Sequence, residues 1–373
     1  MLRALCCELS CSGQGFCSRL SGGDQVEHFL LTSGTVLAFF FSFVSGVHDG
    51  GNLVAASVLS RSMAPRRALL LAASAAFAGP LLCGSAVAVT LSEVFLEGTI
   101  LQPSNRILLC LFLVSAVGSA TLWNIMTWWI GRPSGSSYAL LGGLLGGGVA
   151  AFGFEVIHGW TLFYKVILFL LLCPVIGAML ARLGMAVASH FGREIEGAWR
   201  PLQGLSLFFQ GMGHGANNAQ KSAAVILMLL LSSGSSSDGQ LPFWAILGCS
   251  ASLAAGVPVG GWEIARTLRG KTYRIRPVHS FAAQLAAGVV LAAANLLGGL
   301  LSPNQLVKAS VLGTGAGCRE KTPWWMLGKN VITAWFIHLP ACALIAAAVY
   351  WCAGRALGLG MGSLERIMGG LGP

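Results

Sequence analysis

The chain has 373 residues, of which 55% are hydrophobic and 10% are charged, and its mean hydropathy is +0.74. Because soluble domains carry about 25% charged residues, this composition excludes an ordinary soluble globular protein. The formal net charge is +10, but the basic residues gather in loops between apolar segments, so no nucleic acid is expected as a partner.

Residues 1–28 are predicted to form a poorly ordered N-terminal tail. They contain no continuous apolar stretch of the kind that a signal peptide requires. The tail cysteines lack the paired spacing of a zinc site, so no metal site is predicted, with a redox or metal role kept as an alternative. The other cysteines lie singly in apolar segments and are expected to be small core residues. The tail cysteines are Cys6, Cys7, Cys11 and Cys17.

Beyond the tail, long apolar segments recur, each near the roughly 20 residues that a helix needs to cross a bilayer. Some are short or interrupted, so we predict about ten to twelve transmembrane or re-entrant helices. The fold class that this pattern indicates is an all-α polytopic membrane protein surrounded by membrane lipid. The segments span residues 29–47, 68–91, 107–130, 138–151, 161–181, 202–231, 241–264, 281–300, 307–317 and 326–351.

The loops between these segments alternate in charge. By the positive-inside rule, the loops that are rich in Lys and Arg lie in the cytoplasm, and the loops without them lie outside. The two halves of the chain then enter the membrane with opposite polarity. The basic loops lie near residues 61–67, 182–200, 266–276 and 319–329, and the loops without Lys or Arg span 92–105, 152–160 and 232–240.

This alternation predicts two inverted-topology repeats, an arrangement that is typical of secondary transporters. The predicted divisions are the tail 1–28, a first membrane repeat 29–181, a short cytoplasmic linker 182–203, a second repeat 204–354 and a C-terminal tail 355–373.

A short polar cluster interrupts an apolar stretch once in each half. An ionisable or amide-rich patch at membrane depth is costly, so it normally faces a bundle interior and marks a substrate or ion path. Glycines in the first cluster predict an unwound backbone or a close approach to a ligand. The alternative is that the polar side chains satisfy one another between packed helices. The clusters are Gly46-Val47-His48-Asp49-Gly50-Gly51-Asn52 and His214-Gly215-Ala216-Asn217-Asn218-Ala219-Gln220-Lys221.

A second kind of break also occurs in each half, where hydroxyl and amide residues precede an apolar run. Such residues are typical of a helix N-terminus, where Ser side chains and free backbone amides are available to an anion. They suit a tetrahedral oxyanion such as phosphate, and each also fits an ordinary helix cap. The breaks are Gly131-Arg132-Pro133-Ser134-Gly135-Ser136-Ser137-Tyr138 and Ser302-Pro303-Asn304-Gln305.

Together these motifs resemble those of the PiT inorganic phosphate transporter family. Residues 43–52, continuing to Arg61-Ser62-Met63, are similar to the first signature of its bacterial low-affinity branch, which has His-Asp in place of Asn-Asp. Residues 123–137 resemble the element that follows, and 214–221 the second-half motif. The resemblance covers about residues 35–352. It implies inorganic phosphate as the substrate, H⁺ or Na⁺ as the co-transported ion, and a divalent metal carried with the phosphate as an option, with no bound cofactor.

The chain departs from the family pattern in both halves. Asn218 stands where the family has Asp, and Ser302-Pro303-Asn304-Gln305 stands where it has Ser-Thr-Thr-His. In the first half, Gly135 replaces a hydroxyl residue and Tyr138 replaces a His. These changes leave the fold expectation intact and bear on coupling and on substrate affinity.

The lost carboxylate changes the charge expected at the centre. With Asp49 and Lys221 as its charges, the site sums to zero, where the family pattern of two Asp and one Lys sums to minus one. Because charges about 6 Å apart interact by roughly 3 kcal/mol at an effective dielectric near 20, this loss disfavours Na⁺. We therefore predict proton coupling, with Asp49 and His48 as the relay.

The residues expected at the site fall into two groups. One holds the anion, at the helix starts and at the lysine, and the other handles the coupling ion or proton. The substrate-binding group is Gly135, Ser136, Ser137, Asn217, Lys221, Ser302 and Asn304, and the coupling group is His48, Asp49, Asn52, His214 and Asn218.

The sequence thus predicts a secondary transporter, not an enzyme, that moves phosphate by alternating access in a bacterial cytoplasmic (inner) membrane. One rival is a permease of the same fold for sulfate or another oxyanion. The other is a non-transporting membrane sensor or binding homologue with a degenerate second motif. The oligomeric state is left open, and a homodimer is one option.

Overall fold

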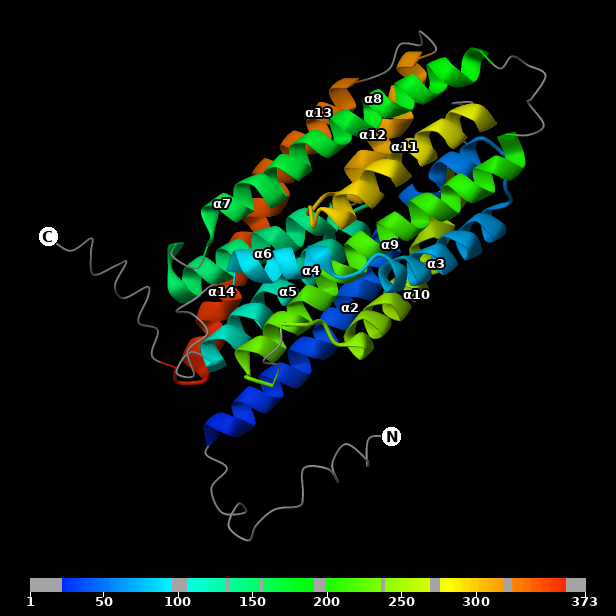
Figure 1. Ribbon diagram of the computed structural model, residues 1–373. Coiled ribbons are helices and arrows are strands. Elements are labelled where there is room, and N and C mark those ends of the chain that lie inside the picture. Colours follow the sequence, from blue (N-terminus) through cyan, green and yellow to red (C-terminus); the bar gives the residue numbers. More distant parts are fainter. Residues whose placement is uncertain are drawn as a thin grey trace, which may run out of the picture.

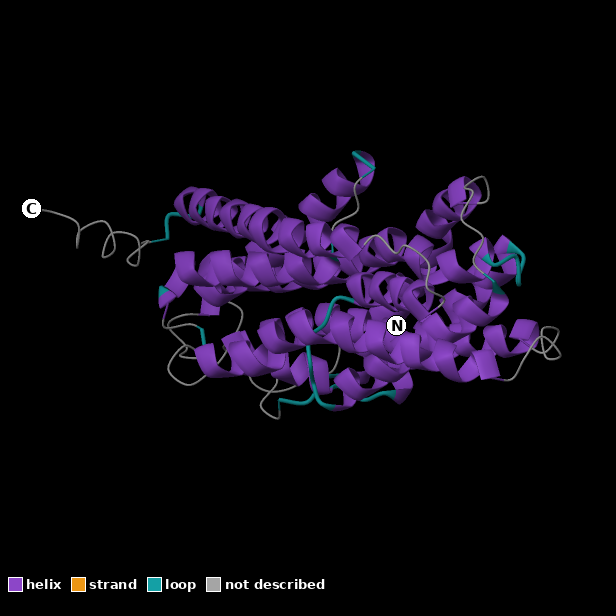
Figure 2. Cartoon of the chain, turned by 90° about the horizontal axis from the view of Figure 1, so that it is seen from above, coloured by secondary structure: helices purple, strands orange, loops and turns teal. Residues whose placement is uncertain are grey.

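The structure is a computed structural model. The residues that it describes form helices and turns, with no strand among them (Figure 2). Most of the predicted tail and several basic loop residues, together with Arg132, Pro133 and Ser134 of the first-half break, lie outside the described residues. The described ranges are 22–95, 106–131, 135–154, 157–190, 199–235, 239–268, 276–317 and 324–359.

The helices follow the predicted apolar segments in order, and two of them contain a short π-helical stretch. They are α2 (Gly22–Leu59), α3 (Pro65–Leu82), α4 (Ala86–Phe95), α5 (Arg106–Trp129), α6 (Ser136–Phe152), α7 (Gly159–Thr161), η4 (Leu162–Ile167), α8 (Leu168–His190), α9 (Trp199–Ser232), α10 (Phe243–Leu268), α11 (Pro277–Leu296), α12 (Pro303–Gly317), α13 (Trp324–Thr333), η6 (Ala334–His338) and α14 (Leu339–Ala356).

Six helical stretches in the described part of the chain are long and apolar enough to cross a membrane. A seventh is added if α3 and α4, which meet at an angle of 66°, form one broken span. The predicted number, about ten to twelve, is larger because it includes helices such as α6 and α12, which are shorter than a full membrane span. The all-helical polytopic fold is confirmed.

Both polar clusters lie on unbroken helices, which corrects the predicted unwound backbone. Helix α2 runs through the first cluster and α9 through the second. The glycines serve packing between helices, because a Cβ on Gly46 would overlap the carbonyl oxygen of Leu253, and one on Gly256 would overlap that of Phe43. Small residues on both helices thus let the backbones of α2 and α10 touch.

The packing of the first half recurs in the second. Helix α2 packs on α10, and its counterpart α9 packs on α3. The pair α5 and α6 packs on α14, while the pair α11 and α12 packs on α8, which runs along one edge of the bundle in Figure 1. The last long helix of the first half, α8, therefore packs on the second half, and the last long helix of the second half, α14, packs on the first.

Helices α2 and α9 run antiparallel. Gly34, near the start of α2, lies next to Leu229 near the end of α9, and Ser60, just after α2, bonds to Gln203 near the start of α9. This crossing brings the two polar clusters to the same level and agrees with the predicted inverted repeats. The orientation of each half in a membrane stays a prediction.

A basic residue that follows α2 lies beside the end of α10. The Arg66 guanidinium lies over the ring of Trp262, 5.7 Å from its centroid, which joins the α2–α3 turn to the end of α10. The methyl group of Met63 faces Gly204 near the start of α9. These contacts agree with the common cytoplasmic side that the positive-inside rule predicts.

Two predicted divisions differ from the helix boundaries. Helix α2 begins at Gly22, inside the predicted tail, and α8 and α9 extend to His190 and from Trp199, inside the predicted linker. Polar residues such as Gln25 and Glu27 end the apolar run without ending the helix, because they form helices readily.

The glycine contact between α2 and α10 is expected to be essential for folding. Replacing Gly256 by Val places side-chain atoms on the backbone of α2, so we expect the free energy of unfolding to fall by at least about 3 kcal/mol. The thermal unfolding of the purified protein in detergent measures this loss. Gly118→Ala is the matched control, because the nearest atom to its Cβ would be a Leu37 methyl carbon at 3.5 Å. Equal stability of the two variants would contradict this account.

Candidate functional site

The centre of the site is the carboxylate of Asp49, which is fully buried on α2. Its Oδ2 accepts hydrogen bonds from the Asn218 amide of α9 at 2.8 Å and from the Ser136 hydroxyl of α6 at 3.4 Å. Its Oδ1 accepts one from the Asn304 amide of α12 at 2.5 Å. One carboxylate therefore ties together four helices, two from each half of the chain.

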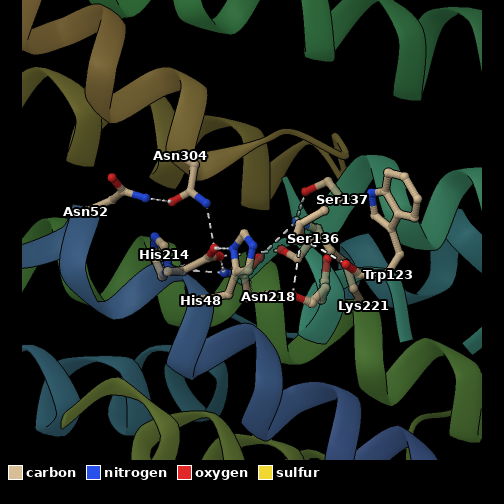
Figure 3. A network of polar contacts seen from close by, with 12 residues as sticks. His48, Asn52, Trp123, Ser136, Ser137, His214, Asn218, Lys221 and Asn304 are labelled. Carbon is tan, nitrogen blue, oxygen red and sulfur yellow. Dashed lines mark hydrogen bonds and ion pairs between the residues drawn. The ribbon is translucent and has the colours of Figure 1, made fainter. Parts of the chain in front are cut away.

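Lys221 lies on α9, one turn beyond Asn218, and its ammonium is also buried. It donates to the Ser137 hydroxyl at 2.6 Å, to Asn218 Oδ1 at 3.0 Å and to the carbonyl oxygen of Leu301 at 3.0 Å. Asn218 thus bridges the two opposite charges, accepting from Lys221 and donating to Asp49. Figure 3 shows this chain of contacts running from Asn52 to Lys221.

The two predicted breaks meet at the site. A Cβ on Gly135 would lie 3.2 Å from the Ser302 hydroxyl oxygen, so the start of α6 and the start of α12 are neighbours. Ser137 also donates to the carbonyl oxygen of Leu301, at 2.8 Å. The Ser302 hydroxyl is buried and has no hydrogen-bond partner among the residues that the structure describes, which leaves one polar group at the junction available to a ligand.

One detail of the first break differs from the prediction. The residue that precedes the first turn of α6 is Gly135, and no side chain caps this helix. The hydroxyls of Ser136 and Ser137 turn instead to Asp49 and to the Leu301 carbonyl. The two hydroxyls donate to these groups because a buried carboxylate and a buried carbonyl each need a hydrogen-bond donor.

Two histidines flank the carboxylate. His48 Nδ1 lies 3.3 Å from Asp49 Oδ1, and His214 Nε2 lies 3.6 Å from Asp49 Oδ2 and 3.0 Å from the Asn218 amide nitrogen. In each ring the other nitrogen is buried and has no hydrogen-bond partner in the described part of the chain. In each ring, one nitrogen thus lies within 4 Å of the carboxylate.

Two of the predicted residues lie at the margin. Asn217 faces away from Asp49 and donates to Asn295 Oδ1 at 3.0 Å and to the carbonyl oxygen of Gly299 at 3.3 Å, so it holds the turn that leads to α12. Asn52 donates to Asn304 Oδ1 at 3.2 Å and is partly exposed. The structure brings the other predicted residues together around Asp49 and Lys221.

The predicted site residues included neither Lys308 nor Gln305, although Gln305 stands in the second break. Lys308 lies one turn beyond Asn304 on α12, on the side of the helix from which the Asn304 amide reaches Asp49. Gln305 accepts a hydrogen bond from the Tyr138 hydroxyl at 2.8 Å, joining α12 to α6. The signal for Lys308 was present in the sequence, because an ionisable residue within an apolar segment normally has a function.

Comparisons with known proteins show the family to which the chain belongs. A sequence profile described as the phosphate transporter family matches residues 45–196 and 186–346. The chain belongs to the phosphate transporter family. This membership confirms the resemblance drawn from the motifs. The long apolar helices, together with the family, show that the chain is an integral membrane protein.

Two bacterial relatives, each described as a probable low-affinity inorganic phosphate transporter, match nearly end to end. The protein of Rhizobium meliloti (strain 1021) is 36% identical over 337 residues, which cover 88% of this chain and 98% of the relative. The protein of Bacillus subtilis (strain 168) is 30% identical over 322 residues, covering 85% and 95%.

A solved structure shares the fold of this family member. It is described as the sodium-dependent phosphate transporter, is 19% identical and superimposes with a TM-score of 0.77. The match covers 88% of this chain and 99% of the other. At this identity the likeness supports the fold alone.

The arrangement of the site has a definite chemical character. Amides, hydroxyls and one ammonium surround a single carboxylate, and two helix N-termini meet beside it. Helix N-termini and amide donors favour an anion. The carboxylate and the two histidine rings are the ionisable groups beside these donors.

Proposed function

We propose that this protein carries inorganic phosphate across a bacterial cytoplasmic membrane by alternating access, with H⁺ as the coupling ion. The observation that carries the proposal is the Asp49–Asn218–Lys221 chain, which joins both halves of the protein beside two converging helix N-termini. Phosphate binds at the starts of α6 and α12, where the unpartnered Ser302 hydroxyl and the Asn304 amide meet its oxygens.

The proton assignment rests on the single carboxylate. Asp49 already accepts from two amides, and the position next to it is an amide, Asn218, so the site offers a sodium ion no second carboxylate. His48 and His214 each place one nitrogen within 4 Å of the carboxylate. Protonation of Asp49 breaks its charge-assisted bonds to α9 and α12, which frees these helices to separate.

Uptake of phosphate into proteoliposomes tests the proposal, with a pH gradient and a Na⁺ gradient imposed separately. We expect the pH gradient to drive accumulation and the Na⁺ gradient to have no effect. Uptake that needs Na⁺ and ignores pH would reject proton coupling, and strong competition by sulfate would favour the rival oxyanion permease. Vesicles that take up no phosphate under either gradient would support a non-transporting role.

Restoring the second carboxylate is expected to change the coupling ion. In Asn218→Asp, a second carboxylate lies within hydrogen-bonding distance of Asp49, and the Lys221 ammonium offsets one of the two negative charges. An added cation between the carboxylates stabilises the state in which both are ionised. We therefore expect uptake by this variant to be stimulated by Na⁺, and to fall in Na⁺-free medium as the external pH is raised. The initial rate of phosphate uptake, measured with Na⁺ or with K⁺, checks the result. A rate that responds to Na⁺ no more than the wild-type rate does would contradict the charge argument.

A further inference from the structure

The ammonium of Lys221 has no hydrogen-bonding capacity left for a ligand. A lysine carries three donors, and all three are used, by Ser137, Asn218 and the Leu301 carbonyl. The side chain is also buried on every side, with a relative exposure of 1%. In this conformation Lys221 holds helices together, and an anion must find its positive charge elsewhere.

Lys308 is the second positive charge near Asp49. Leu306, Ser310 and Gly313 of α12 face α8, where Leu306 and Ser310 lie close to Gly177. Because a helix turns by about 100° per residue, Asn304 and Lys308 lie together on the opposite side of α12. Asn304 uses this side to reach Asp49 and Asn52 on α2, so the stem of Lys308 starts from the same face one turn further on.

The Lys308 ammonium is available. No hydrogen bond or ion pair ties it within the part of the chain that the structure describes, and the side chain is partly exposed. Asn52 is the other partly exposed polar residue of the site. Both lie towards the end of the bundle to which α2 and α12 lead, which is the predicted cytoplasmic end.

We propose that Lys308, with Asn52 and the first turn of α12, forms the anion subsite on the cytoplasmic side of Asp49, and that it binds inorganic phosphate without an added metal cation. The subsite rests on the proposed function and refines it. Lys221 and Lys308 contribute two positive charges and Asp49 one negative charge, so with neutral histidines the site carries a net charge of plus one. That charge favours an anion over Na⁺.

Phosphate binding to the purified full-length protein, in buffer free of Na⁺ and divalent metal, tests the subsite. We expect Lys308→Met to raise the Kd for phosphate by about tenfold or more, because a charge-assisted hydrogen bond is lost. Lys308→Arg keeps the charge and is expected to stay within about threefold of the wild type. Lys329→Met is the matched control, because Lys329 is an exposed lysine on α13 and its loss is expected to leave the Kd unchanged.

A charge-rescue experiment covers the case in which Lys308→Met folds poorly. In Lys308→Cys, on a background in which Cys83, Cys352 and the tail cysteines are replaced by Ser, phosphate affinity is expected to drop. Modification with a thiol reagent that carries an aminoethyl group restores an ammonium and is expected to restore the affinity. A neutral methyl reagent is expected to restore nothing.

The outcomes separate the subsite from the wider proposal. Wild-type binding that persists unchanged in Lys308→Met and in unmodified Lys308→Cys overturns the subsite and leaves phosphate transport standing. Wild-type protein that neither binds nor takes up phosphate overturns both. A requirement for Na⁺ or a divalent metal in wild-type binding also overturns the subsite. A loss of affinity in Lys308→Met that the ammonium reagent reverses in the Cys variant supports it.

Discussion

Asp49→Asn is expected to abolish concentrative phosphate uptake while the protein still inserts into the membrane. The substituted amide cannot take up a proton at any working pH, so the coupling step is lost. It also has a single acceptor oxygen, whereas Asp49 accepts from Asn304 at one oxygen and from Asn218 and Ser136 at the other. At least one buried donor is therefore left without an acceptor, at a cost of about 1–3 kcal/mol.

The measurement is phosphate accumulation in proteoliposomes under an imposed pH gradient, with the amount of reconstituted protein determined in parallel. Glu93→Gln is the control, because it removes a carboxylate that pairs with Lys165 at the protein surface, where its side chain is 51% exposed. We expect this control to accumulate phosphate normally, since exposed ion pairs contribute little. Accumulation against the gradient by Asp49→Asn would refute the role assigned to this carboxylate.

Lys221→Met is expected to lower uptake to background and to destabilise the protein. Methionine fills nearly the same space, but it leaves the Ser137 hydroxyl, the Asn218 side-chain oxygen and the Leu301 carbonyl without their shared donor. A buried acceptor that loses its donor costs about 1–3 kcal/mol, and the Leu301 carbonyl keeps one donor, the Ser137 hydroxyl. The link between α9 and the starts of α6 and α12 is lost at the same time.

Two measurements on Lys221→Met are needed, the melting temperature in detergent and the initial rate of uptake. Lys165→Met is the matched control, because Lys165 is partly exposed and makes one ion pair, with Glu93. We also expect Lys221→Arg to fail, because a guanidinium is too broad for a position with 1% exposure. If Lys221→Met has the melting temperature and the uptake rate of the wild type, Lys221 does not hold α9 to the starts of α6 and α12.

The sequence predicted the helices and the main members of the site because both leave local signals. Apolar runs of membrane length fix the helices, and ionisable groups such as Asp49 and Lys221 stand out within them. The charge alternation of the loops also predicted that the two clusters run in opposite directions, and α2 and α9 are antiparallel. These features depend on composition over short stretches of chain.

Other features depend on contacts between distant segments and could not be predicted. The glycines around Asp49 are compatible both with an unwound helix and with a close contact between two helices. The position of α10 against α2 shows that they serve the close contact. The prediction placed Lys221 among the residues that hold the anion, and the sequence does not show that Leu301 and Ser137 accept hydrogen bonds from its ammonium. Lys308 lies near the site because its side of α12 faces α2, and the sequence alone does not show which side of α12 faces α2.

The exchange of last helices between the halves has a consequence for biosynthesis. Helices α5 and α6 leave the ribosome early, but their packing partner α14 ends at Ala356, close to the C-terminus. Until that segment is made, the surface of α6 that carries Gly142 and Gly146 has no partner. Closure of this long loop is slow, so the nascent chain must wait in a partly assembled state that quality-control proteases can reach.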